Sequence, residues 1–242
     1  MGWLSGLLLE VWEGLEADRG LESVIRLAVE RVTGLGRRIV LGLGSGRTSA
    51  AFIKSLATAA GARIIEAVVP TSMQAEAAAS ENGFRIGSLY NYGGVDIYVD
   101  SFDQCSLSGD LVKGIGGALA REKLLMRLAG SVLLIGTEEK LAEKLSSPIP
   151  LEVLPYAAPA LPRLLRDRGW SVRPKTGEGK AGPVITDNGN VLMLVEVGVV
   201  EDPPFIEREL KMTPGVIEAG VFPNRGYKVI VGMRDGTIRE IT

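Results

Sequence analysis

One carboxylate in this sequence lies on a predicted helix face that is otherwise apolar. In the segment KGIGGALAREKLLMRLA, the residues one turn before and after Glu122 carry no charge: Ala118, Leu119, Leu125 and Met126. A carboxylate on such a face loses hydration, so we expect the pKa of Glu122 to rise toward the neutral range in which a general base works. The alternative is an ion pair with a basic residue, such as the neighbouring Arg121 or Lys123.

Two further carboxylates follow a predicted strand. Residues 95–99 (VDIYV) read as an apolar strand, Asp100 comes directly after it, and Asp103 lies three residues further on. Parallel sheets bind ligands at the carboxyl ends of their strands, and two close carboxylates raise the pKa of one of them. A capping aspartate in a solvated turn is the alternative.

Lys113 precedes the glycines that open the Glu122 helix. At this position it is either a stabiliser of a developing oxyanion or a solvated loop lysine.

A glycine-rich turn joins an earlier strand to a helix. In LGLGSGRTSAAFI, the glycines allow close approach of the backbone, and Ser45 and Thr48 add hydroxyl donors next to helix N–H groups. This combination indicates an anion site, most commonly for phosphate, although a tight turn without a ligand is the alternative. Arg47 occupies the position at which the dinucleotide fingerprint requires its third glycine, and no Gly-Lys-Ser follows. The turn therefore matches neither a dinucleotide site nor a Walker loop.

The composition excludes several classes of protein. The 242 residues contain no histidine, which rules out Ser-His-Asp catalysis, Cys-His catalysis and histidine-ligated zinc. A net charge of −2 without a long basic run argues against nucleic acid as the main partner. The lone Cys105 excludes an intrachain disulfide, and no apolar stretch reaches the ~20 residues of a membrane span. We therefore expect a cytoplasmic protein that does not interact with nucleic acid or a membrane.

The elements that position these residues alternate between strand and helix. Strands are predicted at 38–44, 63–69, 95–99 and 131–136, and helices at 49–62, 73–83 and 116–129, after an amphipathic first helix within residues 1–20. This alternation predicts a parallel sheet covered on both faces. After residue 147 come a proline-rich segment with a helix, a strand near 170–172, a hairpin candidate at Asn188-Gly189 and a helix over 203–211. We therefore predict an α/β domain over 1–147 and 221–242, and a small α+β domain over 148–220.

Several segments resemble, in order and spacing, the successive motifs of the type A ribose-5-phosphate isomerases: LGLGSGRT, VVPTSMQAE, VDIYVDSFDQ, KGIGGALAREK, PIPLEVLPYA, VITDNGNV and PGVIEAGVFPNRG. The resemblance implies a Rossmann-like domain with a smaller inserted ferredoxin-like domain. It also implies interconversion of D-ribose 5-phosphate and D-ribulose 5-phosphate through a cis-enediolate, within the non-oxidative pentose phosphate pathway. It implies no metal or organic cofactor, and a homodimer or homotetramer.

The resemblance also assigns roles to single residues. Glu122 matches the family's general base, and Lys113 matches a lysine that stabilises the enediolate. Asp100 and Asp103 match strand-end aspartates that act in ring opening and hold the sugar hydroxyls. Ser45, Gly46 and Thr48 match the family's phosphate contacts, and Lys140 matches a lysine that follows the next strand. We expect Arg47 and Gly114, which lie beside these residues and beside Lys113, to bind the substrate as well.

The chain departs from the family pattern within the predicted pocket. The differing positions are Ser101, Phe102, Gln104, Ile115 and Arg47. They motivate an alternative hypothesis, a sugar-phosphate-binding module or sensor without catalysis, or an isomerase for another sugar phosphate. The presence of both Glu122 and Lys113 favours the enzyme, because a pure binding protein needs neither. A nucleotide-dependent enzyme is a third hypothesis, and the incomplete glycine fingerprint opposes it.

Overall fold

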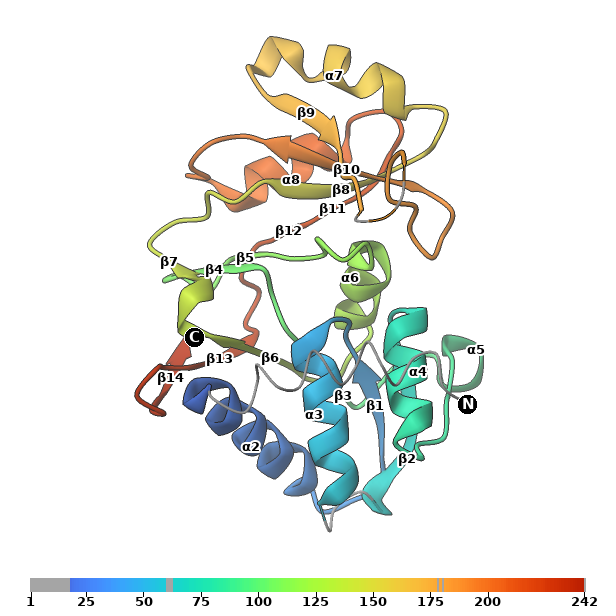
Figure 1. Cartoon of the computed structure of the whole chain (residues 1–242), viewed down its shortest axis with the longest axis vertical. Coiled ribbons are helices and arrows are strands. Elements are labelled where there is room, and N and C mark those ends of the chain that lie inside the picture. The colour runs from blue at the N-terminus through green and yellow to red at the C-terminus, as the bar shows by residue number, and fades with distance from the viewer. Residues whose placement is uncertain (1–17, 60–62, 178, 180, 242) are drawn as a thin grey trace.

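The chain folds into a large parallel-sheet unit with a smaller sheet stacked above it (Figure 1). The structure is a computed structural model that describes residues 18–59, 63–177, 179 and 181–241. The helix predicted within residues 1–20 falls almost entirely outside these described residues, as does the end of the helix predicted at 49–62. In the described part of the chain, none of the helices has the length and apolar character needed to cross a membrane.

The larger sheet positions the candidate site through its strand order, β14-β13-β6-β3-β1-β2. Its strands are β1 (Ile39–Leu43), β2 (Ile65–Pro70), β3 (Ile97–Asp100), β6 (Val132–Thr137), β13 (Lys228–Gly232) and β14 (Ile238–Ile241). Only the β13–β14 pair is antiparallel. The chain moves from β1 to β2 on one side and returns to β3 on the other side of β1. The carboxyl ends at such a switch point are where open α/β sheets bind ligands.

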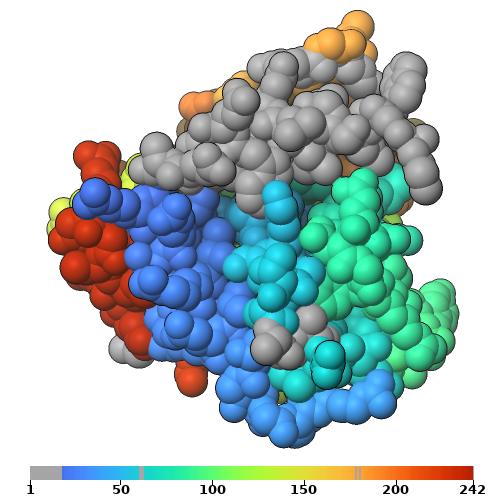
Figure 2. Space-filling model, turned by 60° about the horizontal axis from the view of Figure 1, so that its bottom comes forward, coloured from blue at the N-terminus to red at the C-terminus, as the bar shows by residue number. Residues whose placement is uncertain are grey.

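Three helices cover one face of this sheet. They are α2 (Arg19–Thr33), α3 (Arg47–Thr58) and α4 (Met73–Glu81), which pack in that order against one apolar cluster. Figure 2 shows their outer surface, with the C-terminal strands in red at its left edge. The short α5 (Leu89–Tyr92) follows α4 in the chain, and α6 (Leu119–Arg127) covers the opposite face of the sheet. Coverage of both faces explains why the central strands β1, β3 and β6 are mostly buried and apolar.

The smaller sheet is antiparallel, in the order β11-β8-β10-β9. Its strands are β8 (Ile149–Val153), β9 (Ser171–Pro174), β10 (Val191–Glu196) and β11 (Val216–Ala219). With α7 (Leu161–Leu164), α8 (Pro203–Lys211) and two 3₁₀ turns at Ala158–Ala160 and Arg166–Arg168, it encloses its own apolar core. The predicted fold class, a Rossmann-like α/β sheet with a smaller α+β unit, is confirmed. The predicted domain boundaries at 147/148 and 220/221 stay a prediction.

A third sheet lies between the two units, and the sequence reasoning missed it (Figure 1). Its order is β12-β5-β4-β7, with β4 (Gln104–Ser106), β5 (Leu111–Val112), β7 (Leu141–Ala142) after the 3₁₀ turn Glu138–Lys140, and β12 (Val221–Phe222). The segment from Ser101 to Lys113, for which no strand or helix is predicted above, therefore contains two short strands. Strands of two or three residues are too short to show an alternating pattern, although the paired Cys105 and Leu111 are both fully buried.

Strand β8 was also missed, because prolines concealed it. Pro150 lacks an N–H group, yet β8 pairs on both sides. The Pro150 carbonyl accepts a hydrogen bond from the Gly220 N–H at 2.7 Å. The N–H and C=O groups of one strand residue point to the same side, which for Pro150 is the side of β11. Strand β11 has already ended at Ala219, so the absent N–H of Pro150 costs no hydrogen bond between β8 and β11.

Candidate active site

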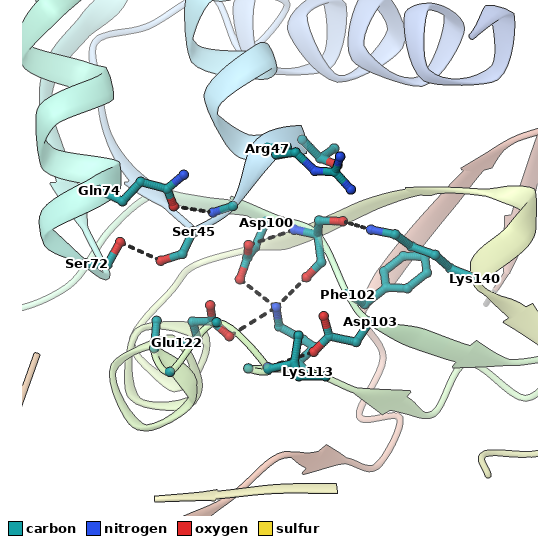
Figure 3. Close-up of a pocket in the computed structure, with 18 of the residues that line it drawn as sticks. Ser45, Arg47, Ser72, Gln74, Asp100, Phe102, Asp103, Lys113, Glu122 and Lys140 are labelled. Carbon is teal, nitrogen blue, oxygen red and sulfur yellow. Dashed lines mark hydrogen bonds and ion pairs between the residues drawn. The ribbon is translucent and has the colours of Figure 1, made fainter. Parts of the chain in front are cut away.

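A cavity of about 830 Å³ lies at the carboxyl ends of β1 and β3 (Figure 3). Gly44 follows β1, and a Cβ atom there would lie 1.8 Å from the carboxyl group of Asp100, so only glycine lets these two strand ends meet. All the residues predicted from the sequence to form the site line this cavity: Ser45, Gly46, Arg47, Thr48, Asp100, Asp103, Lys113, Gly114, Glu122 and Lys140.

Asp100 is buried and receives four hydrogen bonds. Its Oδ1 accepts from the Ser49 hydroxyl at 3.2 Å and from the Ser101 N–H at 2.7 Å. Its Oδ2 accepts from the Tyr98 hydroxyl at 2.5 Å and from Lys113 Nζ at 2.6 Å. A buried carboxylate is tolerated only when its charge is satisfied in this way, and the four donors leave it one orientation.

Lys113 is the cation at the centre of the cluster, and its side chain is only 2% exposed. Its Nζ donates to Asp100 and to the Ser101 carbonyl, and it lies 3.3 Å from Glu122 Oε2. Burial alone would lower the pKa of Lys113, but the carboxyls of Asp100 and Glu122 outweigh burial and raise it. Lys113 therefore remains an ammonium with three donors, held beside two carboxyl groups.

Glu122 has the properties of an acid–base group. It projects from α6 between the buried Leu119 and Leu125, and only 4% of the residue is exposed. Burial raises the pKa of its carboxyl to about 8, and Asp100 adds to the rise while Lys113 opposes it. The rise expected from the apolar helix face is thus present. A carboxyl with a pKa near neutrality can both take up and release a proton at physiological pH.

A second carboxyl–lysine pair extends the cluster. Asp103 accepts a hydrogen bond from the Ile115 N–H at 2.9 Å, and burial raises its pKa despite that bond. Lys140 donates to the Ser101 hydroxyl at 2.9 Å, and its Nζ lies 5.7 Å from the centre of the Phe102 ring. Burial lowers the pKa of Lys140, with Asp103 opposing the change. Ser101 and Phe102, which depart from the family pattern, thus both lie beside this lysine, and Figure 3 shows Phe102 next to it.

The glycine-rich turn forms the opposite wall of the cavity, at the N-terminus of α3. Gly46 precedes α3 with φ +96°, and no side chain caps this helix. The Gly46 N–H donates to Gln74 Oε1 at 2.8 Å, and the Ser45 hydroxyl donates to the Ser72 hydroxyl at 2.7 Å. Arg47 is exposed and forms no ion pair with any residue that the structure describes. An uncapped helix N-terminus next to an unpaired guanidinium is suited to an anion.

Sequence reasoning missed several residues around the site. Tyr98 lies two positions before Asp100, so strand alternation alone places both side chains on one face of β3. Ser72 and Gln74 follow β2, whose carboxyl end adjoins that of β1, and this adjacency could have indicated them. Asp187 lines the cavity from a turn of the smaller sheet, and no local pattern indicates such a distant contact.

The site has the features of one class of enzyme. A buried carboxyl with a near-neutral pKa stands beside an ammonium, and an anion-binding helix terminus lies across the same cavity. Such an arrangement suits proton transfer on a small anionic substrate. Among the described residues, no group of three or more His, Cys, Asp or Glu side chains is arranged to hold a metal ion.

Comparison with known proteins identifies the family. The family model described as ribose 5-phosphate isomerase A (phosphoriboisomerase A) matches residues 67–236. The ribose-5-phosphate isomerase A of Methanothermobacter thermautotrophicus is 39% identical over 199 residues, covering 81% of this chain and 88% of that protein. The protein of the same name from Pyrococcus horikoshii is 39% identical over 202 residues, covering 82% and 88%. The chain belongs to the ribose 5-phosphate isomerase A family of aldose–ketose isomerases.

Solved structures agree with this membership. One is a D-ribose-5-phosphate isomerase in complex with phospho-erythronic acid, with a TM-score of 0.82 and 36% identity over 90% of this chain and 97% of that one. Another is ribose 5-phosphate isomerase A from Methanocaldococcus jannaschii, with a TM-score of 0.81 and 32% identity over 91% and 98%.

Proposed function

We propose that this protein interconverts D-ribose 5-phosphate and D-ribulose 5-phosphate through a cis-enediolate, with Glu122 as the group that moves the proton. The observation that carries the proposal is the buried Glu122 carboxyl on the cavity wall, 3.3 Å from the Lys113 ammonium. The family membership supports the substrate.

The proposed reaction uses one carboxyl group twice. Glu122 removes the proton from C2 of the open-chain aldose, and the electron pair of that bond forms the C1–C2 double bond while negative charge develops on O1. Lys113 stabilises this charge from its position beside Glu122. Glu122 then returns the proton to C1, and transfer of the O2 hydroxyl proton to O1 leaves the ketone. A carboxyl with a pKa near 8 suits both halves of this cycle.

The remaining site residues bind the rest of the substrate in this proposal. Asp100 and Asp103 take the sugar hydroxyls and assist ring opening, and both line the cavity beside Lys113. The phosphate is bound at the α3 N-terminus by Ser45, Gly46, Arg47 and Thr48, and Gly114 and Lys140 contact the substrate from the other wall of the cavity. Phospho-erythronic acid, the ligand in a solved relative, combines a phosphate with a carboxylate and so resembles the charge pattern of the enediolate.

The cellular role belongs to the same proposal. A place in the non-oxidative pentose phosphate pathway, a cytoplasmic location and a homodimeric or homotetrameric state rest on the family membership alone.

The experiment is isomerisation in D₂O. Purified protein, freed of phosphate, is incubated with ribose 5-phosphate, and the ribulose 5-phosphate is analysed by NMR. A carboxyl that exchanges its proton with solvent during the enediolate stage leaves deuterium at C1. Deuterium at C1 would exclude a direct hydride shift, because that shift retains the substrate hydrogen completely. Binding of the sugar phosphate without any product would favour the sensor hypothesis instead.

A further inference from the structure

A fully buried carboxylate lies outside the catalytic cluster, in the smaller sheet. Glu152 of β8 has 0% of its surface exposed. Its Oε1 accepts three hydrogen bonds, from the Thr186 hydroxyl at 3.0 Å and from the side-chain amides of Asn188 at 2.9 Å and Asn190 at 2.8 Å. Its Oε2 has no hydrogen-bond partner among the residues that the structure describes.

The stability of the sheet does not explain this residue. A buried carboxylate with one unpartnered oxygen is costly, and an apolar side chain would suit the middle of a sheet better. All three donors come instead from one turn, residues 186–190, which connects Ile185 to Val191 in a tight antiparallel bridge. The hydrogen bonds therefore determine the shape of that turn rather than the pairing of β8.

The same turn forms part of the catalytic cavity. Thr186 and Asp187 both line it. The Asp187 carboxylate accepts a hydrogen bond at 2.8 Å from the N–H of Met73, the first residue of α4. The turn therefore joins the smaller sheet to a helix terminus that borders the glycine-rich turn.

A second contact connects the turn to the helix that carries Glu122. Arg121 Nε donates to Asn188 Oδ1 at 2.7 Å, and Arg121 Nη2 donates to the Asp187 carbonyl at 2.9 Å. The Asn188 side chain thus accepts from Arg121 and donates to Glu152. An unbroken chain of hydrogen bonds runs from the core of the smaller sheet to the residue next to the proposed base.

We propose that Glu152 is a positioning residue of the isomerase site, which holds the 186–190 turn in place as a wall of the substrate cavity. The proposal rests on the proposed function. Since the turn lines the cavity but supplies none of the groups proposed for proton transfer, loss of its shape should affect substrate binding first. The three hydrogen bonds to Oε1 carry the effect.

Three variants test the proposal by their KM and kcat for ribose 5-phosphate. Glu152→Leu removes the three acceptor bonds, and Asn188→Ala removes one of them together with the contact to Arg121. Both should raise KM about tenfold or more while kcat changes by less than about threefold. Glu152→Gln is the matched control, because its amide oxygen can accept the same three bonds, and it should keep a native KM. Asn188 is exposed, so its variant is expected to fold even if the leucine variant does not.

A second measurement does not depend on activity. Amide hydrogen exchange across residues 184–191 should accelerate in Glu152→Leu and Asn188→Ala but not in Glu152→Gln. A native KM and native exchange in folded Asn188→Ala would overturn the proposal. So would equal impairment in the leucine and glutamine variants, which would assign the effect to the charge. If the native protein shows no isomerase activity, the proposed function fails, while the exchange data still decide whether Glu152 holds the turn.

Discussion

The ammonium of Lys113 lies 3.3 Å from the carboxyl of Glu122, and the two side chains are only 2% and 5% exposed. The same ammonium lies 2.6 Å from Asp100, so one buried cation serves two carboxyl groups. A proton on Glu122 balances the charge of this trio, and its removal leaves an excess negative charge in a buried space. Burial is the main reason that Glu122 holds its proton to an unusually high pH, and the charge of Asp100 adds to this effect.

Glu122→Gln should abolish turnover with little effect on substrate binding. The amide keeps the shape of the side chain but cannot accept a proton from carbon, so kcat should fall about 10³-fold and KM should change by only a few-fold. The measurement is the steady-state rate of ribulose 5-phosphate formation. Unchanged unfolding temperature or a higher one serves as the control for folding. Retention of more than about a tenth of native kcat would assign the base to another residue.

The activity of the native protein should rise with pH. The base must be unprotonated, and the Glu122 carboxyl has a pKa of about 8, so kcat/KM should increase about tenfold per pH unit below that value and level off above it. The profile is best measured from pH 6.5 to 9.5, because the substrate phosphate titrates near pH ~6. A flat profile over this range would contradict the raised pKa.

The same residue should make the native protein less stable at alkaline pH. Between its ordinary value of 4.5 and the folded value of about 8, folded Glu122 binds a proton that the unfolded chain has released. Stability from this group is therefore complete below pH 4.5 and is lost as the pH rises to 8. Glutamine has no proton to lose, so its stability contribution does not change over this range. The free energy of unfolding of Glu122→Gln should therefore increase relative to that of the native protein between pH 5 and 8. Urea unfolding at pH 5, 7 and 9 measures it; a native protein more stable than the variant at pH 9 would show that the Lys113 ion pair dominates.

Arg47 should contribute to binding of the phosphate rather than to chemistry. Its guanidinium is exposed at the cavity and unpaired with the described residues, and a hydrogen bond to a charged group contributes about 1.5–3 kcal/mol. Arg47→Ala should therefore raise KM for ribose 5-phosphate about tenfold with kcat nearly unchanged. D-ribose without a phosphate is the control substrate, and its slow turnover should not change. An equal loss with both substrates would place Arg47 elsewhere in the mechanism.

Local sequence patterns predicted those site residues whose positions depend only on the helix or strand that carries them. The apolar neighbours of Glu122 are set by helical spacing, and the place of Asp100 is set by the end of one strand. The confirmed helix over 203–211 likewise begins at a capping Asp202 followed by prolines, which is visible in the sequence.

The parts that escaped prediction depend on contacts between distant segments. Glu122 pairs with Lys113 rather than with Arg121 or Lys123, because the turn at Gly114 brings the lysine beneath the helix. Arg121 instead donates a hydrogen bond to Asn188 in the 186–190 turn, and Lys123 donates one to the carbonyl of Ala219 at the end of β11. The periodicity of the sequence does not indicate which of these basic residues pairs with Glu122. The hairpin turn at 186–190 was expected as a turn, but its position on the cavity depends on how the two units pack.

Phe102 lies against a glycine that cannot be enlarged. A Cβ atom on Gly136 of β6 would lie 2.4 Å from Phe102 Cζ, so the ring occupies the space that this glycine leaves free. Gly136→Ala should push the ring into the cavity that Phe102 lines, raise KM, and cost about 1–3 kcal/mol of stability through overpacking. Gly177→Ala is the matched control, since its Cβ would lie at an ordinary 3.5 Å from the nearest side chain.

The double variant decides whether this contact determines the shape of the cavity. Phe102→Ala alone leaves a void under Lys140 and should destabilise the protein by about 3–5 kcal/mol. In Gly136→Ala with Phe102→Ala, the alanine methyl has no ring to displace, so the glycine substitution should cost almost nothing and the rise in KM that it causes alone should disappear. A double-mutant cycle on urea unfolding and on KM measures the coupling. Additive effects would show that the Gly136 variant acts on the β6 backbone instead, because only a direct contact between the ring and the new methyl group makes the two substitutions interdependent.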